Sequence, residues 1–244
     1  MPRTNRYLLP DHVCHVTSLT VVLIFAAAGI CDAGLSYTQL VDRAAGVSAT
    51  IITIPAAQNR GFAVLDVPVR MPRDTVRNHW TNTYELMING GFFMPDNTPA
   101  GYCRINERVL VSNVVKRWSG MVAIDAAGTL SLLHRTNDFS SYPTVLQIGP
   151  YVIDPGGTIG IRSDDRLRAE RTLIGVTTSG TLLIMTTKPV TLFDLAVAVK
   201  MQMPDVERLL NLDGGPSTAL KTADLEVVNR SPVRNYIVKQ RAKP

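Results

Sequence analysis

NLDGGPSTAL, residues 211–220, places an acid, a tight backbone turn and two hydroxyl side chains next to one another. The apolar run at residues 209–212 predicts a buried strand that carries Asp213 to its exposed end. Gly214 and Gly215 adopt backbone angles closed to other residues and let a ligand come within contact distance of the main chain. The stretch therefore predicts a reaction centre where a strand becomes a loop, and the rest of the chain is organised around it.

The second half of this turn adds hydrogen-bond donors. Pro216 fixes one backbone dihedral and removes one N–H group. The remaining N–H groups can form an anion-binding concavity, and the hydroxyls of Ser217 and Thr218 are further donors. The turn thus predicts an acid beside a phosphate-sized anion site. The alternative is an ordinary β-turn in which Asp213 caps its own backbone.

A second strand-like run, MINGGFF at residues 87–93, also ends in two glycines. Asn89, Gly90 and Gly91 stand in the same relation to this run as the acid and its glycines do to the other. Because both runs end at a glycine pair, we expect the two strand ends to meet in space and to share one site.

The aromatic pair after these glycines, Phe92 and Phe93, divides between two faces of an extended chain. One ring then points inward, and the other faces the cleft, where it can stack on a sugar. The alternative is that both rings lie in the core.

Five motifs in this order resemble the phosphodiester glycosidase family. They are NGGFF (residues 89–93), a later Pro-x-Gly (99–101), QIGPYVIDPGG (147–157), ERTLIGV (170–176) and NLDGGPST (211–218). The resemblance covers roughly residues 50–240. It departs at Pro216, where many relatives carry a third glycine and often a second serine. The resemblance implies a hydrolase that cleaves a glycosidic bond to a phosphate ester.

The resemblance implies that Asp213, Arg171 and Asn89 are the catalytic residues. Asp213 acts as base or nucleophile, and Asn89 orients a sugar hydroxyl. Arg171 holds the phosphate, because a guanidinium at the mouth of a buried strand needs a partner and a phosphate offers a bidentate one. A salt bridge from Arg171 to Glu170 or to Asp213 is the alternative. The predicted substrate-binding residues are Gly90, Gly91, Phe92, Gln147, Gly149, Thr172, Gly214, Gly215, Ser217 and Thr218.

A phosphodiester leaving group needs little protonation, so the main tasks of such an enzyme are to neutralise the phosphate and to assist attack at the anomeric carbon. The partner carboxylate stays open among Glu85, Glu107, Asp138 and Glu170. One alternative function is a protein that binds a polysaccharide or sugar phosphate without turnover. Another is a serine hydrolase using Ser217, but the chain lacks a G-x-S-x-G elbow and an obvious histidine partner.

Residues 1–33 predict a signal peptide, and residues 34–244 predict one catalytic domain. Arg3 and Arg6 precede an apolar run at residues 19–30, which at about 12 residues is shorter than the roughly 20 of a membrane-spanning helix. We therefore expect an exported protein, periplasmic or secreted, acting on envelope material or exopolysaccharide, with no membrane span in the mature chain. The alternative is an uncleaved N-terminal anchor.

The composition limits the function classes. The chain has 244 residues, 45% of them hydrophobic and 18% charged, which suits one sizeable domain. Its net charge of +5 is scattered, so it fits anionic ligands better than nucleic acid. The substrate, a sugar phosphodiester or polysaccharide, is the expected partner, and the sequence does not indicate an oligomeric state.

Signal cleavage would leave Cys103 as a lone cysteine, which excludes an intrachain disulfide and a thiolate zinc site. With only His79 and His134 left in the mature chain, a histidine metal cluster is also disfavoured. We expect no cofactor. Binding of calcium or magnesium at Asp213 is the alternative, because hard cations need only oxygen ligands.

The expected fold class is α+β, with curved, mostly antiparallel sheets packed against one or two helices. A helix is predicted from an N-cap at Thr191 to about Met203. The other predictions are a hairpin at residues 172–176 and 181–186, a meander at 109–115, 120–124 and 129–133, a surface loop or lid at 162–168, and a terminal strand at 229–239 in which Asn235 faces the site.

Overall fold

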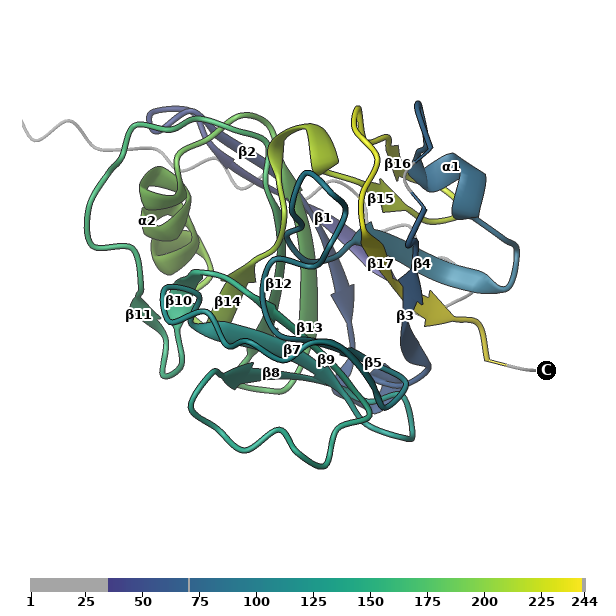
Figure 1. The fold of residues 1–244 in the computed structure, drawn as a ribbon. Coiled ribbons are helices and arrows are strands. Elements are labelled where there is room, and N and C mark those ends of the chain that lie inside the picture. The colour runs from purple at the N-terminus through teal and green to yellow at the C-terminus, as the bar shows by residue number, and fades with distance from the viewer. Residues whose placement is uncertain (1–34, 70, 243–244) are drawn as a thin grey trace, which may run out of the picture.

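The structure is a computed structural model that describes residues 35–69 and 71–242 (Figure 1). These residues form three antiparallel sheets and two α-helices, so the α+β prediction is confirmed. The signal peptide predicted at residues 1–33 lies outside the described residues. Within the described part of the chain, neither helix has the length and apolar character needed to cross a membrane.

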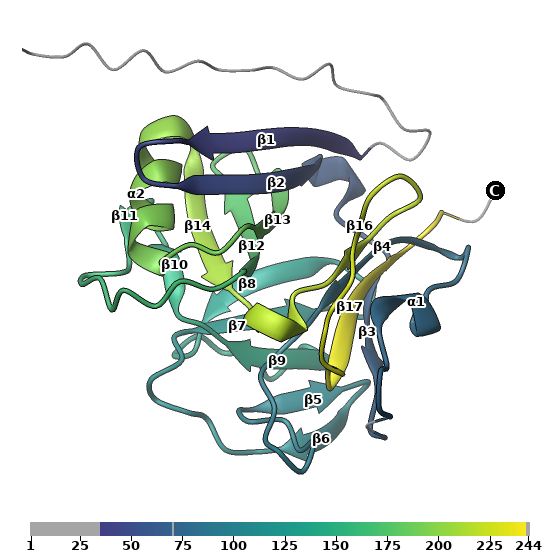
Figure 2. The same cartoon turned by 90° about the horizontal axis from the view of Figure 1, so that it is seen from above.

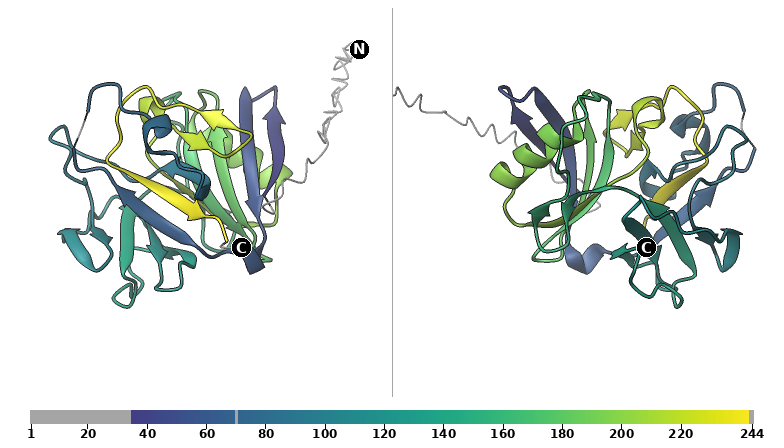
Figure 3. Two further views of the ribbon diagram at one scale, coloured as in Figure 1. Left: turned by 90° about the vertical axis from the view of Figure 1, so that its right-hand side faces the viewer. Right: turned by 60° about the vertical axis from the view of Figure 1, so that its left-hand side comes forward.

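The largest sheet has seven strands and carries the longer helix on one face. Its strands follow the order β1 (Ser36–Asp42), β2 (Val47–Ile54), β13 (Leu182–Thr187), β12 (Thr172–Thr177), β14 (Val206–Asn211), β10 (Tyr151–Asp154) and β11 (Thr158–Ile159). Helix α2 (Leu192–Gln202) packs on this sheet, away from β17 (Figure 3). The predicted N-cap is confirmed, because the Thr191 hydroxyl accepts a hydrogen bond from the backbone N–H of Asp194 at 3.0 Å.

Two five-stranded sheets complete the architecture. One has the order β16 (Glu226–Val227), β15 (Leu220–Lys221), β4 (Tyr84–Asn89), β17 (Asn235–Gln240) and β3 (Phe62–Asp66). The other has the order β6 (Arg108–Val111), β5 (Cys103–Ile105), β9 (Thr144–Ile148), β7 (Gly120–Ile124) and β8 (Leu130–His134). The remaining elements are helix α1 (Val76–His79) and the short 3-10 turns η1 (Ala56–Gln58) and η2 (Gly215–Ser217).

The main core lies where the inner faces of the three sheets meet. Ile52, Ile88 and Val122, one from each sheet, are fully buried in the same cluster. Side chains alternate along the strands, so on β14 Leu210 faces this core while Leu209 packs under α2. This alternation also decides which residues at the strand ends face the site.

The hairpin prediction is confirmed, since β12 and β13 pair antiparallel in register. The meander prediction is confirmed for β7 and β8, which pair antiparallel, but it is wrong for the strand at 109–115, because β6 pairs with β5, and β9 lies between β5 and β7. The terminal strand is shorter than predicted and begins at Asn235. The reason is that Arg230 and Ser231 donate their N–H groups to the carbonyl of Pro216 and not to a neighbouring strand.

Candidate functional site

The two glycine-pair strand ends meet, as predicted, although β4 and β14 belong to different sheets. The N–H of Asp213 donates to the carbonyl of Gly90 at 3.2 Å. In return, Asn89 Nδ2 donates to the carbonyl of Asp213 at 2.7 Å. Figure 2 shows the turn that follows β14 as a yellow-green helical turn between the ends of β14 and β17.

Asn89 is fully buried at this junction, with 0% of its surface exposed, and its side chain links three segments. Besides its bond to the Asp213 carbonyl, its Oδ1 accepts from Thr172 Oγ1 at 2.7 Å and from the N–H of Ala219 at 2.9 Å. A buried amide needs such partners, and here they come from β12 and from both sides of the acidic turn. Asn89 therefore positions the turn, and its contact with a sugar hydroxyl stays a prediction.

Asp213 is half-buried at the surface end of this junction. Its Oδ1 accepts the N–H of Gly214 at 2.9 Å, and the hydroxyl of Ser217 also bonds to the carboxyl. Burial raises the pKa of Asp213 above its ordinary value, while the bonds from Ser217 and Gly214 oppose the rise. The carboxyl is thus a group whose affinity for a proton is increased by its surroundings, as acid–base catalysis requires.

The two glycines after Asp213 are needed for different reasons. A side chain on Gly214 would bring Cβ to within 2.7 Å of the Glu170 carbonyl oxygen, so Gly214 is required for close packing. Gly215 has φ +60°, in the left-handed region, and its N–H donates to the same carbonyl at 2.7 Å. The turn is thereby pressed against the main chain that enters β12.

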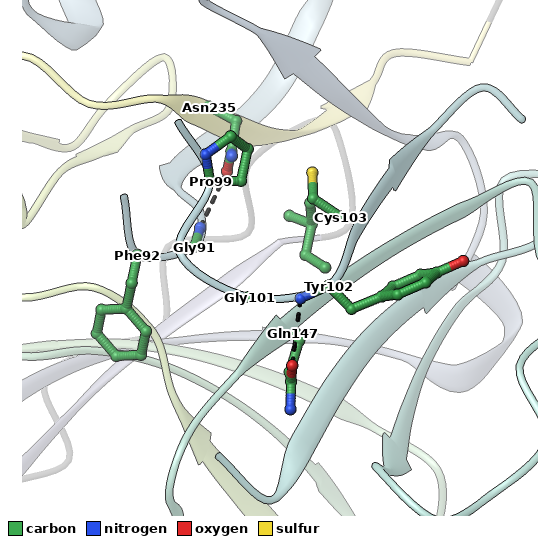
Figure 4. Close-up of a pocket in the computed structure, with 9 residues that line it drawn as sticks. Gly91, Phe92, Pro99, Gly101, Tyr102, Cys103, Gln147 and Asn235 are labelled. Carbon is green, nitrogen blue, oxygen red and sulfur yellow. Dashed lines mark hydrogen bonds between the residues drawn. The ribbon is translucent and has the colours of Figure 1, made fainter. Parts of the chain in front are cut away.

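The glycines after Asn89 pack against Asn235 at the start of β17. Asn235 therefore lies beside the junction, as predicted. Asn235 Oδ1 accepts the N–H of Gly91 at 2.9 Å, and a Cβ on Gly90 would lie only 2.0 Å from that oxygen. A hollow of about 180 Å³, its open mouth included, lies beside Gly91, Asn235 and Gln147 (Figure 4). Asp213 is not among the residues that line this hollow.

The side chain of Gln147 has a structural role, because it connects two loops by hydrogen bonds. It is 3% exposed, and its amide makes four hydrogen bonds, accepting from the N–H groups of Tyr102 and Val115 and donating to the carbonyls of Val115 and Trp118. Every one of these partners is a backbone group, so the side chain joins two loops. The following Gly149 packs against the backbone of Trp118 and Ser119.

Three hydroxyl residues surround the junction. Thr172 is fully buried and bonds to Asn89. Ser217 is buried and bonds to Asp213. Thr218 is 2% exposed, and its Oγ1 has no hydrogen-bond partner among the described residues. A buried hydroxyl without a partner is rare, so Thr218 is a group that a ligand or water can satisfy.

Arg171 points to the other side of the large sheet. Its neighbour Leu173, which shares its face of β12, packs under α2, whereas Thr172 faces Asn89. The guanidinium donates from Nη2 to the carbonyl of Leu167 at 2.7 Å and from Nε to that of Val190 at 3.4 Å. Burial lowers the pKa of Arg171, while the charge of Asp165 opposes this change.

Through these two hydrogen bonds, Arg171 connects the polar loop at residues 162–168 to the segment that leads into α2. Among the described residues, Arg171 does not form the salt bridge to Glu170 or Asp213 that was the predicted alternative. Glu170 pairs instead with Arg230, at 2.8 Å. Phosphate binding by Arg171 stays a prediction.

The side chains of Phe92 and Phe93 diverge, but each packs against an apolar cluster, so stacking of either ring on a sugar stays a prediction. Phe92 is half-buried against the main core, and its ring lies 4.9 Å from that of Trp118 with the planes tilted by 37°. Phe93 packs in a separate cluster with Met87 and Tyr236. Phe92 is among the residues that line the hollow, and in Figure 4 its ring points away from Cys103. Trp118 was not predicted from the sequence, although an Arg-Trp pair in a polar loop is a usable signal.

Of the four candidate partner carboxylates, Glu170 contacts the Asp213 turn through its backbone, because its carbonyl accepts the N–H of Gly215, while its carboxylate pairs with Arg230. Glu85 forms a buried ion pair with Lys239. Glu107 is exposed in a turn, and Asp138 accepts the N–H of Ser140 at 2.8 Å.

The described histidines lie in other contacts. His79 Nε2 lies 2.8 Å from Asp74, and His134 bonds to Thr136. Ser217 thus bonds to an acid and not to a histidine, which disfavours a serine hydrolase. Within residues 35–69 and 71–242, no group of three or more histidine, cysteine or acidic side chains is arranged to hold a metal ion.

Comparison with known proteins gives one family and several similar folds. A model of the phosphodiester glycosidase family matches residues 82–241. The catalytic domain of zebrafish N-acetylglucosamine-1-phosphodiester alpha-N-acetylglucosaminidase, in a structure auto-inhibited by its pro-peptide, superimposes with a TM-score of 0.62 at 15% identity, over 86% of this chain and 82% of that one. No curated protein matches the chain in sequence.

Two further solved structures share the fold. A hypothetical protein from Synechocystis has a TM-score of 0.60 at 16% identity, covering 84% of this chain and 62% of its own. A Burkholderia pseudomallei protein, named as a candidate exported protein, has a TM-score of 0.54 at 12% identity, covering 79% of this chain and 73% of its own. At these identities the likeness shows the fold.

Proposed function

Because the chain belongs to the phosphodiester glycosidase family, we propose that it hydrolyses the bond between the anomeric carbon of a sugar and a phosphate ester. Family membership supports a hydrolase of this kind. The observation that carries the finer proposal is the half-buried carboxyl of Asp213, held at the junction of two glycine-pair strand ends. The name of the zebrafish relative makes N-acetylglucosamine linked to a phosphodiester the first substrate to test.

In this proposal Asp213 is the base or nucleophile. Its pKa is raised by burial, so it holds a proton more readily than an exposed aspartate and can exchange one with a reacting group. The Ser217 hydroxyl and the Gly214 N–H fix the orientation of the carboxyl. Since a phosphodiester leaves without much protonation, one well-placed carboxyl assists most of the reaction.

The turn after Asp213 supplies the groups for the anion. Gly215 lets the backbone turn in the left-handed region, and Ser217 follows it in a short helical turn. The Oγ1 of Thr218 lacks a partner among the described residues, which leaves a donor for a ligand oxygen. Donors placed before the reaction stabilise developing negative charge without further rearrangement.

We also propose that residues 34–244 are one catalytic domain, exported by the N-terminal segment to act on envelope material or exopolysaccharide. The support is the charge and apolar pattern of residues 1–33 in the sequence. A fold shared with a protein named as a candidate exported protein agrees with this.

The test is release of free sugar from a panel of sugar 1-phosphodiesters by the wild type and by Asp213→Asn. We expect the variant to lose at least about a hundredfold in kcat/KM, because the group that transfers the proton or attacks the sugar is gone. Asp164→Asn is the matched control, since this exposed loop acid bonds only to the N–H of Arg166 in the described contacts. Full activity of Asp213→Asn would reject the assignment.

The panel also separates the alternative of a binding protein. If wild type and Asp213→Asn both bind a sugar phosphate and neither releases sugar, the pocket binds without turnover.

A further inference from the structure

A half-exposed aromatic pair adjoins the Gly90–Gly91 end of the junction. Trp118 lies in the loop between β6 and β7, and its ring contacts that of Phe92 at 4.9 Å. The guanidinium of Arg117 lies over the indole, 5.3 Å from its centroid. The three side chains therefore form a stack whose outer member is a cation; we call it the Arg117 stack.

The loop that carries this stack is fixed by hydrogen bonds from a buried side chain of the sheet beneath it. The buried amide of Gln147 donates to the carbonyls of Val115 and Trp118 at 2.7 and 3.0 Å. Gly101 lies so close that a Cβ there would sit 2.8 Å from the indole ring. Because buried hydrogen bonds and close packing fix the indole, the stack is a preformed surface although its loop is exposed.

The stack borders the same residues as the proposed active site. Phe92 follows Gly91 directly, and Gly90 accepts the hydrogen bond from Asp213. On its other side, the backbone of Trp118 packs against Gly149. The Arg117 stack thus adjoins the end of β4, where the carbonyl of Gly90 accepts the N–H of Asp213.

Three arginines near the junction differ in what their guanidinium groups already bind. Arg171 donates to two backbone carbonyls on the helix side of the sheet. Arg230 is paired with Glu170 at 2.8 Å. For Arg117 no hydrogen bond or ion pair is recorded within the described residues, and its side chain is exposed. Its N–H donors face solvent and are available to a ligand.

We propose that Arg117, held on the indole of Trp118, is the residue that reads the phosphate of the substrate. This rests on the proposed function, since it names the group that selects a phosphodiester over a neutral glycoside at the same site. A guanidinium binds phosphate through two parallel charge-assisted bonds. Stacking on an aromatic ring orders the guanidinium before the ligand arrives, which reduces the entropy lost on binding. Trp118 is its positioning residue.

The first experiment measures binding without turnover. The chain has two tryptophans, Trp80 and Trp118, so Trp80→Phe leaves Trp118 as the only indole fluorophore. In an Asp213→Asn background of the full chain, we would titrate N-acetylglucosamine 1-phosphate and glucose 1-phosphate against their neutral methyl glycosides at constant ionic strength. We expect a saturable change in Trp118 emission with at least one sugar phosphate, at concentrations where the methyl glycosides give little change.

The matched reporter is Trp118→Phe in the same background, which leaves Trp80 as the fluorophore. Trp80 lies near Lys221 and Tyr84, among residues of the second sheet, and its emission should not change with the sugar phosphates. A response of Trp80 equal to that of Trp118 would indicate a general effect of the ligand on the protein and would overturn the proposal.

The second experiment tests the guanidinium itself. Arg117→Gln should weaken sugar-phosphate affinity by about tenfold to a hundredfold, and Arg117→Lys should recover only part of it, because lysine keeps the charge and loses the two-pronged geometry. Lys116→Gln removes one charge from the adjacent position and should leave affinity within about twofold of the parent, because an exposed charge without direct contact is screened. Equal losses in Arg117→Gln and Lys116→Gln would mean that diffuse charge attracts the ligand, and would overturn the proposal.

The two proposals fail in different ways. If the wild type hydrolyses phosphodiesters while Trp118 emission and the Arg117 variants show no effect of phosphate, Arg117 does not read it and the catalytic proposal stands. If Trp118 responds to sugar phosphates in an Arg117-dependent way and no substrate is hydrolysed, the phosphate site stands and the hydrolase proposal fails.

Discussion

Replacement of Asn89 by alanine tests whether this residue mainly stabilises the junction or mainly binds the sugar. The side chain makes three hydrogen bonds, to the carbonyl of Asp213, the hydroxyl of Thr172 and the N–H of Ala219. Alanine would leave a buried carbonyl and a buried N–H without partners, while the hydroxyl of Thr172 can rotate toward another acceptor.

The expected loss follows from these groups. Each of these two buried groups left without a partner costs about 1–3 kcal/mol, so Asn89→Ala should lower the free energy of unfolding by about 2–6 kcal/mol. That is a large part of the roughly 5–15 kcal/mol that stabilises a typical domain. Thr172→Val removes only the hydroxyl partner and should cost about 1 kcal/mol. The losses in the double variant should fall short of their sum, because both changes remove the same bond.

The assay is urea unfolding followed by circular dichroism at pH 7, with the slope of the transition checked for each variant. Asn113→Ala is the matched control, since this asparagine is exposed in the loop before Trp118. A loss below about 1 kcal/mol for Asn89→Ala would refute the reasoning and would favour a role of the amide in substrate binding.

Three further outcomes are expected. Burial raises the folded-state pKa of Asp213, so the folded protein binds this proton more tightly and loses stability as pH rises from about 4 through the folded-state pKa. Asp213→Asn lacks this titrating group. The unfolding free energy of the variant minus that of the wild type, measured in urea, should therefore be more favourable to the variant at pH 7 than at pH 3. Burial raises the pKa of Cys103 to about 12, so in a full chain with its other cysteines replaced by serine a thiol reagent should react only after unfolding. Gly215→Ala should cost about 1–2 kcal/mol from backbone strain alone, whereas Gly90→Ala should cost more in thermal unfolding, because its Cβ would lie 2.0 Å from Asn235.

Local sequence was sufficient for the elements that form the junction. The apolar runs before the two glycine pairs predicted β4 and β14, and the helix cap at Thr191 was found from its spacing to Asp194. Strand ends, turns and caps depend on neighbouring residues, so their signals lie within a few positions of one another. The same signals predicted that the two glycine-pair ends share one site.

The pairing of strands could not be derived in the same way. The meander prediction joined neighbours in sequence, but β9 enters the sheet between β5 and β7. On β9, the side chain of Gln147 also holds the loop before β7 by donating to the carbonyls of Val115 and Trp118. A glutamine in an apolar strand shows in the sequence as a polar interruption, whereas its four backbone partners become visible only when distant loops are brought together.

The sequence by itself determined that an acid, two hydroxyls and two glycine pairs stand at strand ends, since each of these is a local pattern. Only the tertiary structure decided what faces the junction. Alternation along β12 assigns Thr172 and Arg171 to opposite faces, but it does not say which face meets Asn89 and which meets α2. That choice depends on the sheets and the helix that pack against each face. As a result, the guanidinium of Arg171 binds two loop carbonyls, while that of Arg117, in the loop between β6 and β7, lies exposed over the ring of Trp118.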